Sequence, residues 1–520
     1  MLLTPGRRPA APSENFGWSS WPPLAEFERQ VARTAGPPLA AAEALTAARA
    51  FHAEMGLPPG AEGTGGLLLT GHQPELFHPG VWAKNVALFR LARRCGLTPL
   101  NLIVDTDLVK STSVRVPDLR LPPGHVFDVA YAVGPFDQPH ETWRVDPDSE
   151  ELTSFPEQVA AHLAGVAGRP LVADFWPMVL AAVRERTACL GWALASARRL
   201  WEERWGIHNW EVPLSRLCAL PSFARFLGEI AARPHEFHES QATALAGFRK
   251  RYRLRSRSHP FPDLQRREAT WELPFWVWSD QQPRRQRLFG RQGGVGAPCE
   301  LGWWTDAWQP LPVPWPESVD RQPDALAELT ALGWRLRSRA LATTLFARRC
   351  LGQGFIHGLG GGLYDQVTDE LMTTFFGLPA PPPYLTLTAT LHLRAEGVPA
   401  ASDQVRELKQ RAWSARWHAE RLLAQEPEAG EAWLPLGAEK RAWIEREPAS
   451  RAERRQRCQA LKAINHKLAA SLQPWQERWT AELETAQAAA CLERLCRDRD
   501  WSFVLHDADD LSRLMASIAV

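Results

Sequence analysis

The clearest pattern of apolar and polar positions lies between residues 66 and 107. The apolar run GLLLT (66–70) predicts a short strand, and GHQPELFHPG (71–80) is rich in turn-forming residues. In VWAKNVALFRLARRCG (81–96) the apolar positions have helical spacing, and TPLNLIVDTD (98–107) is a second apolar strand. A strand, a helix and another buried strand form a βαβ crossover, which predicts an α/β fold with a parallel sheet covered by helices on both faces.

A second unit of this kind follows late in the chain. A helix over about 335–351 precedes a strand, GFIH (354–357), and a helix is predicted from Tyr364 to Phe376. The glycine run GLGGG (358–362) connects that strand to that helix. In a doubly wound sheet this second unit and the first should open on the same edge.

The rest of the chain has other patterns. Residues from about 120 to 335 mix helical and alternating segments, which predicts an α+β insertion. Apolar residues recur at heptad spacing in 402–425 and 449–487, and a turn-rich segment separates these two stretches. They predict an antiparallel coiled-coil arm, and Pro474 should kink its second helix.

We therefore expect four parts in the chain. These are an N-terminal helical extension (1–60), a core (61–395) with an insertion at about 120–335, a coiled-coil arm (396–487) and a C-terminal segment that returns to the core (488–520).

Charge and composition exclude several classes of protein. The 60 basic and 59 acidic side chains give a net charge of +1, and 45% of the residues are hydrophobic. This composition excludes a disordered chain and a protein held to nucleic acid by its overall charge, so any anion-binding surface must be local. Arginines alternate in RKRYRLRSRSH (249–259) and could grip phosphates. Such a run is usually a solvated face, and the near-zero net charge argues against a nucleic-acid partner.

Cysteine usage and hydropathy indicate the cellular compartment. The eight cysteines form no CxxC pair, which argues against a zinc ribbon and against a disulfide framework and favours a reducing environment. The chain has no stretch of about 18 uncharged apolar residues. We expect a cytoplasmic protein with a small-molecule substrate and no membrane partner.

The strongest candidate site follows the two strands of the first unit. His72 and Gln73 come where a parallel sheet binds its ligands, and His72 and His78 could bind phosphate oxygens or act as an acid–base pair. Alternatively, His78 caps the next helix and His72 satisfies a backbone group in the turn. Asp105 and Asp107 end the second strand and could orient a ribose, a metal ion or an amine, unless they serve in turn and N-cap contacts.

The glycine run provides a second candidate. Glycines let the backbone curl and approach a ligand closely, and the following helix N-terminus carries a positive partial charge. The run is neither GxGxxG nor a Walker A loop. The candidate ligand contacts here are His357, Gly358, Gly360, Gly361, Gly362 and Asp365.

These motifs, taken in order, resemble the bacillithiol biosynthesis cysteine-adding enzyme family. The residues that match its first-loop pattern are Gly71, Gln73, Leu76 and Trp82 in GHQPELFHPGVWAKN. Arg339, at the start of the helix before the late strand, also fits, as does the glycine loop. At three places the chain departs from the family: the family has Gln where this chain has His72, Gly-Pro where it has Pro79-Gly80, and a more acidic, His-containing segment where it has DTD (105–107).

The resemblance implies a Rossmann-like core related to class I nucleotidyltransferases, with an inserted region and a coiled-coil arm that could form a homodimer. It implies a ligase that forms a carbon–nitrogen bond, joining the carboxylate of cysteine to the amine of a glucosaminyl malate with help from a nucleotide, ATP or ADP. Lys84 and Arg339 would then stabilise phosphate oxygens. Two alternatives stay open: a nucleotidyltransferase-like enzyme on another substrate, and a non-catalytic scaffold that binds a nucleotide.

Overall fold

The computed structural model describes residues 10–34, 38, 40–120, 124–134, 136–256, 258, 260–291, 299–395 and 401–518. The ends of the predicted parts at 1–9, 396–400 and 519–520 lie outside these ranges, as do Arg257 and His259 of the basic run.

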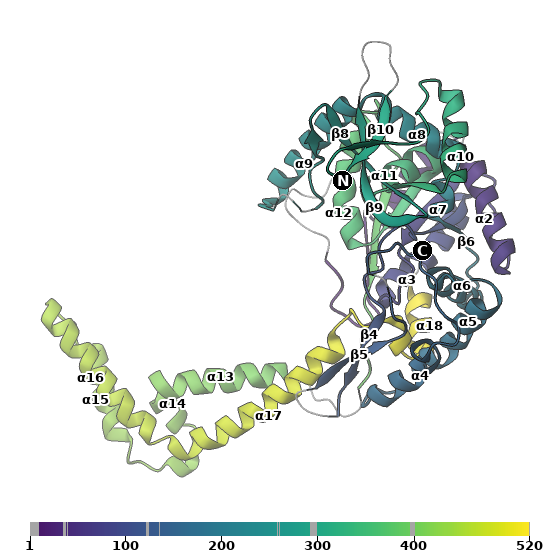
Figure 1. Ribbon diagram of the computed structural model, residues 1–520. Helices are drawn as coiled ribbons and strands as arrows, with labels where there is room; N and C mark the ends of the chain where they lie inside the picture. Colours follow the sequence, from purple (N-terminus) through teal and green to yellow (C-terminus); the bar gives the residue numbers. More distant parts are fainter. Residues whose placement is uncertain are drawn as a thin grey trace.

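A six-stranded sheet forms the centre of the body (Figure 1). Its spatial order is β1 (Trp18–Trp21), β14 (Tyr384–Ala389), β13 (Gly352–His357), β2 (Leu67–His72), β3 (Thr98–Ile103) and β6 (Trp210–Pro213). All neighbouring pairs are parallel except β1 with β14. The predicted parallel sheet is therefore confirmed in part: most strands are parallel, but the antiparallel edge strand β1 makes the sheet mixed.

Helices cover both faces of this sheet, which explains why its strands are continuous apolar runs rather than alternating ones. Leu68 of β2 packs into one core cluster, whereas its neighbours Leu67 and Leu69 pack into another on the opposite face. The first cluster contains residues of α1 (Leu24–Arg33), α3 (Pro79–Cys95), α4 (Glu150–His162), α5 (Val172–Glu185), α6 (Leu190–Glu202) and α18 (Ala508–Ser517). The second contains residues of α2 (Ala41–Met55), α7 (Leu214–Leu217), α8 (Pro221–Ala232), α9 (Pro234–Tyr252), α10 (Gln322–Ala331), α11 (Ala340–Phe346) and α12 (Leu359–Thr374).

The region between β3 and β13 corrects the predicted insertion. A single insertion over 120–335 is wrong, because β6 lies inside that range and belongs to the central sheet. Before β6 the chain forms a hairpin of β4 (Ser113–Asp118) and β5 (His125–Ala130), followed by α4 to α6. After β6 it forms a second, antiparallel sheet of β11 (Trp308–Pro310), β10 (Glu300–Trp304), β9 (Gln282–Arg291), β8 (Thr270–Ser279) and β12 (Trp334–Ser338), with β7 (Arg266–Arg267) beside β8. At four residues, β6 is too short for its apolar pattern to stand out between helices.

The N-terminal and C-terminal segments both pack onto this core. The first 60 residues are not purely helical, because β1 extends the central sheet next to β14. At the other end Trp501 and Phe503 enter the core cluster around α3, and Arg90 of α3 donates to the carbonyl of Met515 at 3.0 Å. None of the helices in the described ranges has the length and apolar character that a membrane span requires.

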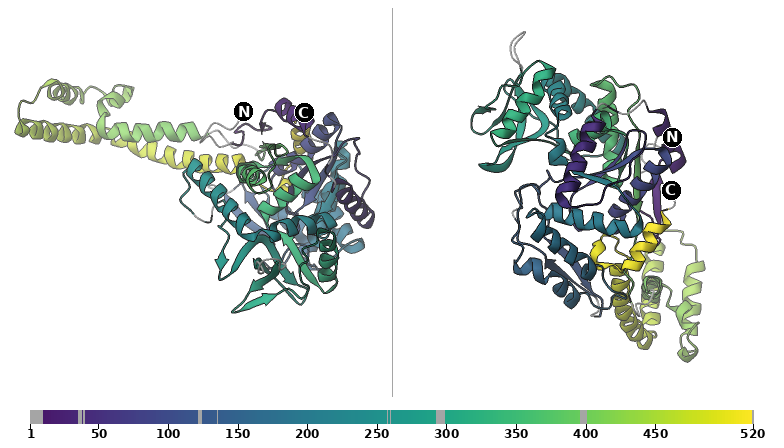
Figure 2. Two further views of the ribbon diagram at one scale, coloured as in Figure 1. Left: turned by 90° about the horizontal axis from the view of Figure 1, so that it is seen from above. Right: turned by 90° about the vertical axis from the view of Figure 1, so that its right-hand side faces the viewer.

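A long helical arm projects from the body (Figure 1, Figure 2). It contains α13 (Ser402–Trp417), α14 (Ala419–Leu423), α15 (Leu434–Glu445), α16 (Arg451–Ala470) and α17 (Gln473–Arg497). The predicted apolar positions Leu408 and Leu422 are buried in the apolar cluster of this arm. The second predicted helix, however, is two helices, because Pro474 lies in the first turn of α17, where the missing N–H breaks no helical hydrogen bond.

Candidate functional site

The candidate site lies where the chain reverses its direction of travel across the central sheet. From β2 the chain moves to β3 on one side, and from β13 it moves to β14 on the other, while β2 and β13 are parallel neighbours. The helices that follow them, α3 and α12, belong to the core clusters on opposite faces. In open α/β sheets this reversal leaves a crevice at the carboxyl ends of the strands, where ligands bind.

Lys84, on the first turns of α3, is a buried cation whose pKa is strongly lowered. Its side chain is buried, and Nζ donates a hydrogen bond to the carbonyl oxygen of Gly71 at 2.9 Å. Burial, reinforced by the nearby Arg198, lowers the pKa of Lys84 from 10.5 to about 7. Its charge in turn contributes to the lowered pKa values of His72, His78 and His357, so the charge of one amine acts on three imidazoles.

His72 ends β2 with both ring nitrogens facing oxygen atoms. Nδ1 lies 3.1 Å from the carbonyl oxygen of Gln73, and Nε2 lies 3.3 Å from Oδ1 of Asn85. A neutral imidazole donates from only one nitrogen, so it satisfies only one of these contacts. Burial, together with Arg198 and Lys84, nevertheless holds the pKa of His72 well below its ordinary value. His72 is therefore a neutral imidazole in a setting that offers two acceptors.

His78 is the N-cap of α3. Its Nδ1 accepts a hydrogen bond from the backbone N–H of Gly80 at 3.1 Å. Burial, with Arg499 and Lys84, lowers the pKa of His78 to about 4, so the ring is neutral and its proton is on Nε2. The capping alternative from the sequence is thus what the geometry shows, and Nε2–H remains as a donor.

His357 ends β13 in an oriented pair with a carboxylate. Its Nε2 lies 2.9 Å from Oδ2 of Asp365, which also accepts from Nη1 of Arg348 at 2.7 Å. Although burial raises the pKa of Asp365, Arg348 and His357 together bring it below its ordinary value. The carboxylate therefore holds the His357 proton on Nε2 and leaves Nδ1 as a free acceptor, which is the orientation that a general base needs. Arg348 was not recognised from the sequence, because it is 17 residues from Asp365 and follows no motif.

The glycine run is not a loop, as the sequence analysis expected, but the N-cap and first turn of α12. Gly358 is the N-cap, and none of these glycines has a positive φ. A Cβ at Gly361 would lie 2.7 Å from Nδ1 of His357, and one at Gly362 would overlap the hydroxyl of Thr386. A Cβ at Gly358 or Gly360 would meet no atom within 4 Å. The run thus serves two purposes: its last two glycines let α12 pack closely, and Gly358 and Gly360 leave open space at a helix N-terminus.

Asp105 and Asp107 have different surroundings. Asp105 is fully buried and accepts hydrogen bonds from the backbone and hydroxyl of Ser215 and from the indole of Trp192, so its oxygens are occupied by the protein. Asp107 is half-buried, and its Oδ2 accepts from Nε2 of Gln73 at 2.8 Å. The structure therefore brings Gln73 and Asp107 together and gives Asp105 a structural role that joins β3 to α7.

Arg285 of the second sheet reaches this same edge, and Arg339 follows the last strand of that sheet. Arg285 donates to the carbonyl oxygen of Thr106 at 3.0 Å, and its guanidinium stacks on Trp276. Arg339 stacks on the same indole and pairs with the buried Glu272. Arg339 is thus tied to the second sheet through its partner Glu272. Arg285, which lies in no sequence motif, reaches the loop after β3.

A buried polar network supports His72 and Lys84 from behind. Arg198 pairs with Glu202 at 2.8 Å and with Glu211 at 2.7 Å, and Asn85 donates to the same Glu202 oxygen at 2.8 Å. A small cavity between this network and the first loop is lined by His72, Pro74, Glu75, Leu76, Phe77, Ile103, Leu194, Ala195, Arg198 and Phe503. The spacing of Arg198 and Glu202 by four residues was the only sequence signal for this network.

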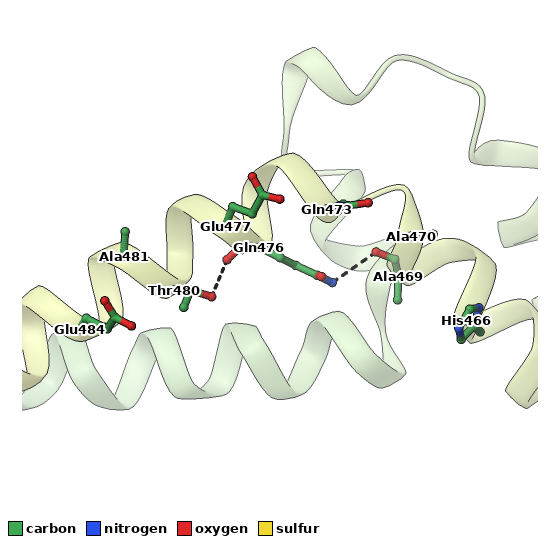
Figure 3. A pocket seen from close by; sticks show the side chains of 9 residues that line it. All are labelled: His466, Ala469, Ala470, Gln473, Gln476, Glu477, Thr480, Ala481 and Glu484. Carbon is green, nitrogen blue, oxygen red and sulfur yellow. Dashed lines mark hydrogen bonds between the residues drawn. The ribbon is translucent and has the colours of Figure 1, made fainter.

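A wider, open groove lies on the arm, at the bend between α16 and α17 (Figure 3). Its lining is polar and small, with the amide of Gln476 bonded to the carbonyl of Ala469 at 3.2 Å, and it contains no buried charged group. It therefore offers none of the chemistry seen at the strand junction. In the part of the chain that the structure describes, no group of three or more His, Cys, Asp or Glu side chains is arranged to hold a metal ion.

Comparison with known proteins adds no further assignment. No model of a protein family matches the chain, and the search of curated proteins finds no relative.

Proposed function

We propose that this chain binds a nucleotide at the junction of β2 and β13 and is a ligase that joins an amino-acid carboxylate to a small amine, as in the bacillithiol cysteine-adding enzymes that its sequence resembles. The observation that supports the proposal most directly is Lys84. An amine with a pKa of about 7, buried beside neutral histidines, is costly for folding and is typical of a group that binds an anion or transfers a proton.

The surroundings of Lys84 fit the phosphates of a nucleotide. The N-termini of α3 and α12 both lie at the carboxyl edge of the sheet and carry a positive partial charge. His78 caps α3, whereas no side chain caps the first turn of α12. Gly358 and Gly360 leave room for an anion to approach the backbone of α12. A phosphate there would also keep Lys84 protonated, because a nearby negative charge raises the pKa of an amine.

The same residues suit amide formation. A carboxylate does not react with an amine in water, because its oxygen is a poor leaving group, and the nucleotide would supply a phosphoryl or adenylyl group that converts that oxygen into a good one. Lys84 in its charged form would neutralise the phosphate oxygens. His357, with Nδ1 free and Nε2 held by Asp365, would accept the proton that the amine releases when its nitrogen bonds to the acyl carbon.

Isothermal titration of the full chain with ATP and with ADP tests the proposal. We expect saturable binding to the wild-type protein and at least a tenfold weaker affinity in Lys84→Met. Lys110→Met, which removes a lysine from the exposed segment after β3, is the matched control and should bind like wild type. A turnover assay with cysteine and glucosaminyl malate then separates a ligase from a scaffold, since a scaffold would bind nucleotide and form no amide. Absence of nucleotide binding to the wild type would contradict the proposal.

A further inference from the structure

The outer end of the arm concentrates positive charge. Residues 440–470, which form the end of α15 and all of α16, contain nine Lys and Arg but only three Glu, although the whole chain has a net charge of +1. Six of the positive charges in this short segment are therefore balanced elsewhere in the molecule. Like the basic run at 249–259, this segment is a candidate for the local anion-binding surface that the overall charge left open.

Five basic side chains of α16 are exposed and form no ion pair within the described ranges. The exposed basic side chains of this helix are Arg451, Arg454, Arg455, Lys462 and Lys467. None of them forms an ion pair with another residue in the described ranges, whereas basic residues nearby do: Lys440 pairs with Glu420 at 2.7 Å and Arg411 with Glu407 at 2.9 Å. Unpaired charges at this density repel one another, so the arrangement favours an anionic partner.

The form of α16 indicates which anion it fits. Its apolar side chains Ile464 and Leu468 are buried against the other arm helices, so its exposed face has no apolar stripe to insert into a lipid bilayer. The exposed apolar residues of this region, Leu434 and Ile444, are on α15. Arg451, Arg454, Arg455 and Lys462 share one face of α16, which is about 17 Å long at a rise of about 1.5 Å per residue, and Lys467 lies outside it. That length matches about half a turn of a nucleic-acid duplex, whose turn is about 34 Å.

The position of α16 makes this face accessible. α15 and α16 form the free end of the arm, far from the central sheet in Figure 1 and in the left-hand view of Figure 2. A long, rigid partner could lie across this helix without contact with the body. We propose that α16 is a docking surface for the phosphate backbone of a double-stranded nucleic acid. This goes against the expectation from the net charge, because that argument averages over the whole chain and the arm separates the charge in space.

Fluorescence anisotropy of the full chain tests this docking surface. The probes are a fluorescein-labelled 20-base-pair RNA duplex and a DNA duplex of the same sequence, titrated at several salt concentrations between 50 and 200 mM. The triple variant Arg451→Gln/Arg454→Gln/Arg455→Gln keeps good helix formers in α16. We expect it to bind at least tenfold more weakly than wild type at 50 mM salt, and the slope of log affinity against log salt to fall by about 3, since each phosphate contact contributes about 0.9.

A control variant removes the same charge elsewhere. Arg251→Gln/Arg253→Gln/Arg255→Gln neutralises three exposed arginines of the basic run at the end of α9 and should change the affinity less than twofold. Which of the two duplexes binds more tightly distinguishes RNA from DNA as the source of the phosphates.

An equal loss of affinity in both triple variants would overturn the proposal. So would an unchanged affinity in the arm variant, or binding to phosphatidylserine vesicles with none to either duplex. Loss of self-association in the arm variant, with no duplex binding by wild type, would instead assign the face to a second copy of the chain.

Discussion

Lys84→Met should make the protein more stable near neutral pH while it weakens nucleotide binding. Methionine keeps the length of the side chain and removes its amine, which is buried and donates a single hydrogen bond, to Gly71. The pKa of the amine is about 7 in the folded chain and 10.5 ordinarily. Because the folded-state pKa is lowered, the unfolded chain binds a proton between pH 7 and 10.5 that the folded chain does not, and wild-type stability rises with pH across this window.

The magnitude follows from that difference in pKa. At about 1.4 kcal/mol for each pH unit, keeping Lys84 buried costs about 5 kcal/mol of unfolding free energy at pH 7 and below. The variant removes this cost but leaves the Gly71 carbonyl without its donor, which costs about 1–3 kcal/mol. We therefore expect Lys84→Met to be about 2–4 kcal/mol more stable than wild type at pH 6, with an advantage that shrinks to near zero by pH 9.

Urea unfolding followed by tryptophan fluorescence at pH 6, 7, 8 and 9 measures this difference. The unfolding midpoints of wild type and Lys84→Met should converge as the pH rises, and Lys110→Met should follow the wild type at every pH. If the midpoints of wild type and Lys84→Met changed in parallel from pH 6 to pH 9, Lys84 would have an ordinary pKa and the reasoning from burial would be refuted.

Three further substitutions separate packing from ligand contact. In Gly362→Ala the new Cβ overlaps the Thr386 hydroxyl, so the melting midpoint should fall by several degrees in differential scanning calorimetry, whereas Gly360→Ala, with open space around its Cβ, should melt within a degree of wild type. Asp105→Ala leaves the buried Ser215 N–H and hydroxyl without their acceptor, so urea unfolding should show a loss of about 2–4 kcal/mol. Any Asp105→Ala protein that folds should keep its nucleotide affinity in isothermal titration, and a selective loss of binding would give Asp105 a direct role.

Local chemistry was enough to predict the elements around the candidate site. The apolar runs that became β2, β3 and β13 are long enough to be recognised as buried strands, and their order with α3 between the first two predicted a parallel sheet. The turn residues after β2 correctly marked the loop that contains Gln73, but β2 extends through His72, which the sequence had placed in that loop. The heptad positions Leu408 and Leu422 correctly marked the buried face of the arm.

Contacts between segments far apart in the sequence decided the remaining features of the site and the sheet. Asp105 and Asp107 look alike in the sequence, yet only the fold brings Ser215 and Trp192 to the first and Gln73 to the second. The same holds for the Arg348–Asp365 pair and for the four-residue strand β6, whose place in the sheet depends on its pairing with β3.

Lys84 shows which of its properties the sequence determined and which the tertiary structure decided. The sequence by itself determined that a lysine would stand at the start of the helix after the first strand, where a phosphate could meet it. Its lowered pKa depends on burial and on Arg198, which is more than a hundred residues away, so only the tertiary structure could decide it. The physical reason is that strands and helices form from short-range patterns, whereas desolvation and charge act through space on whatever the fold brings together.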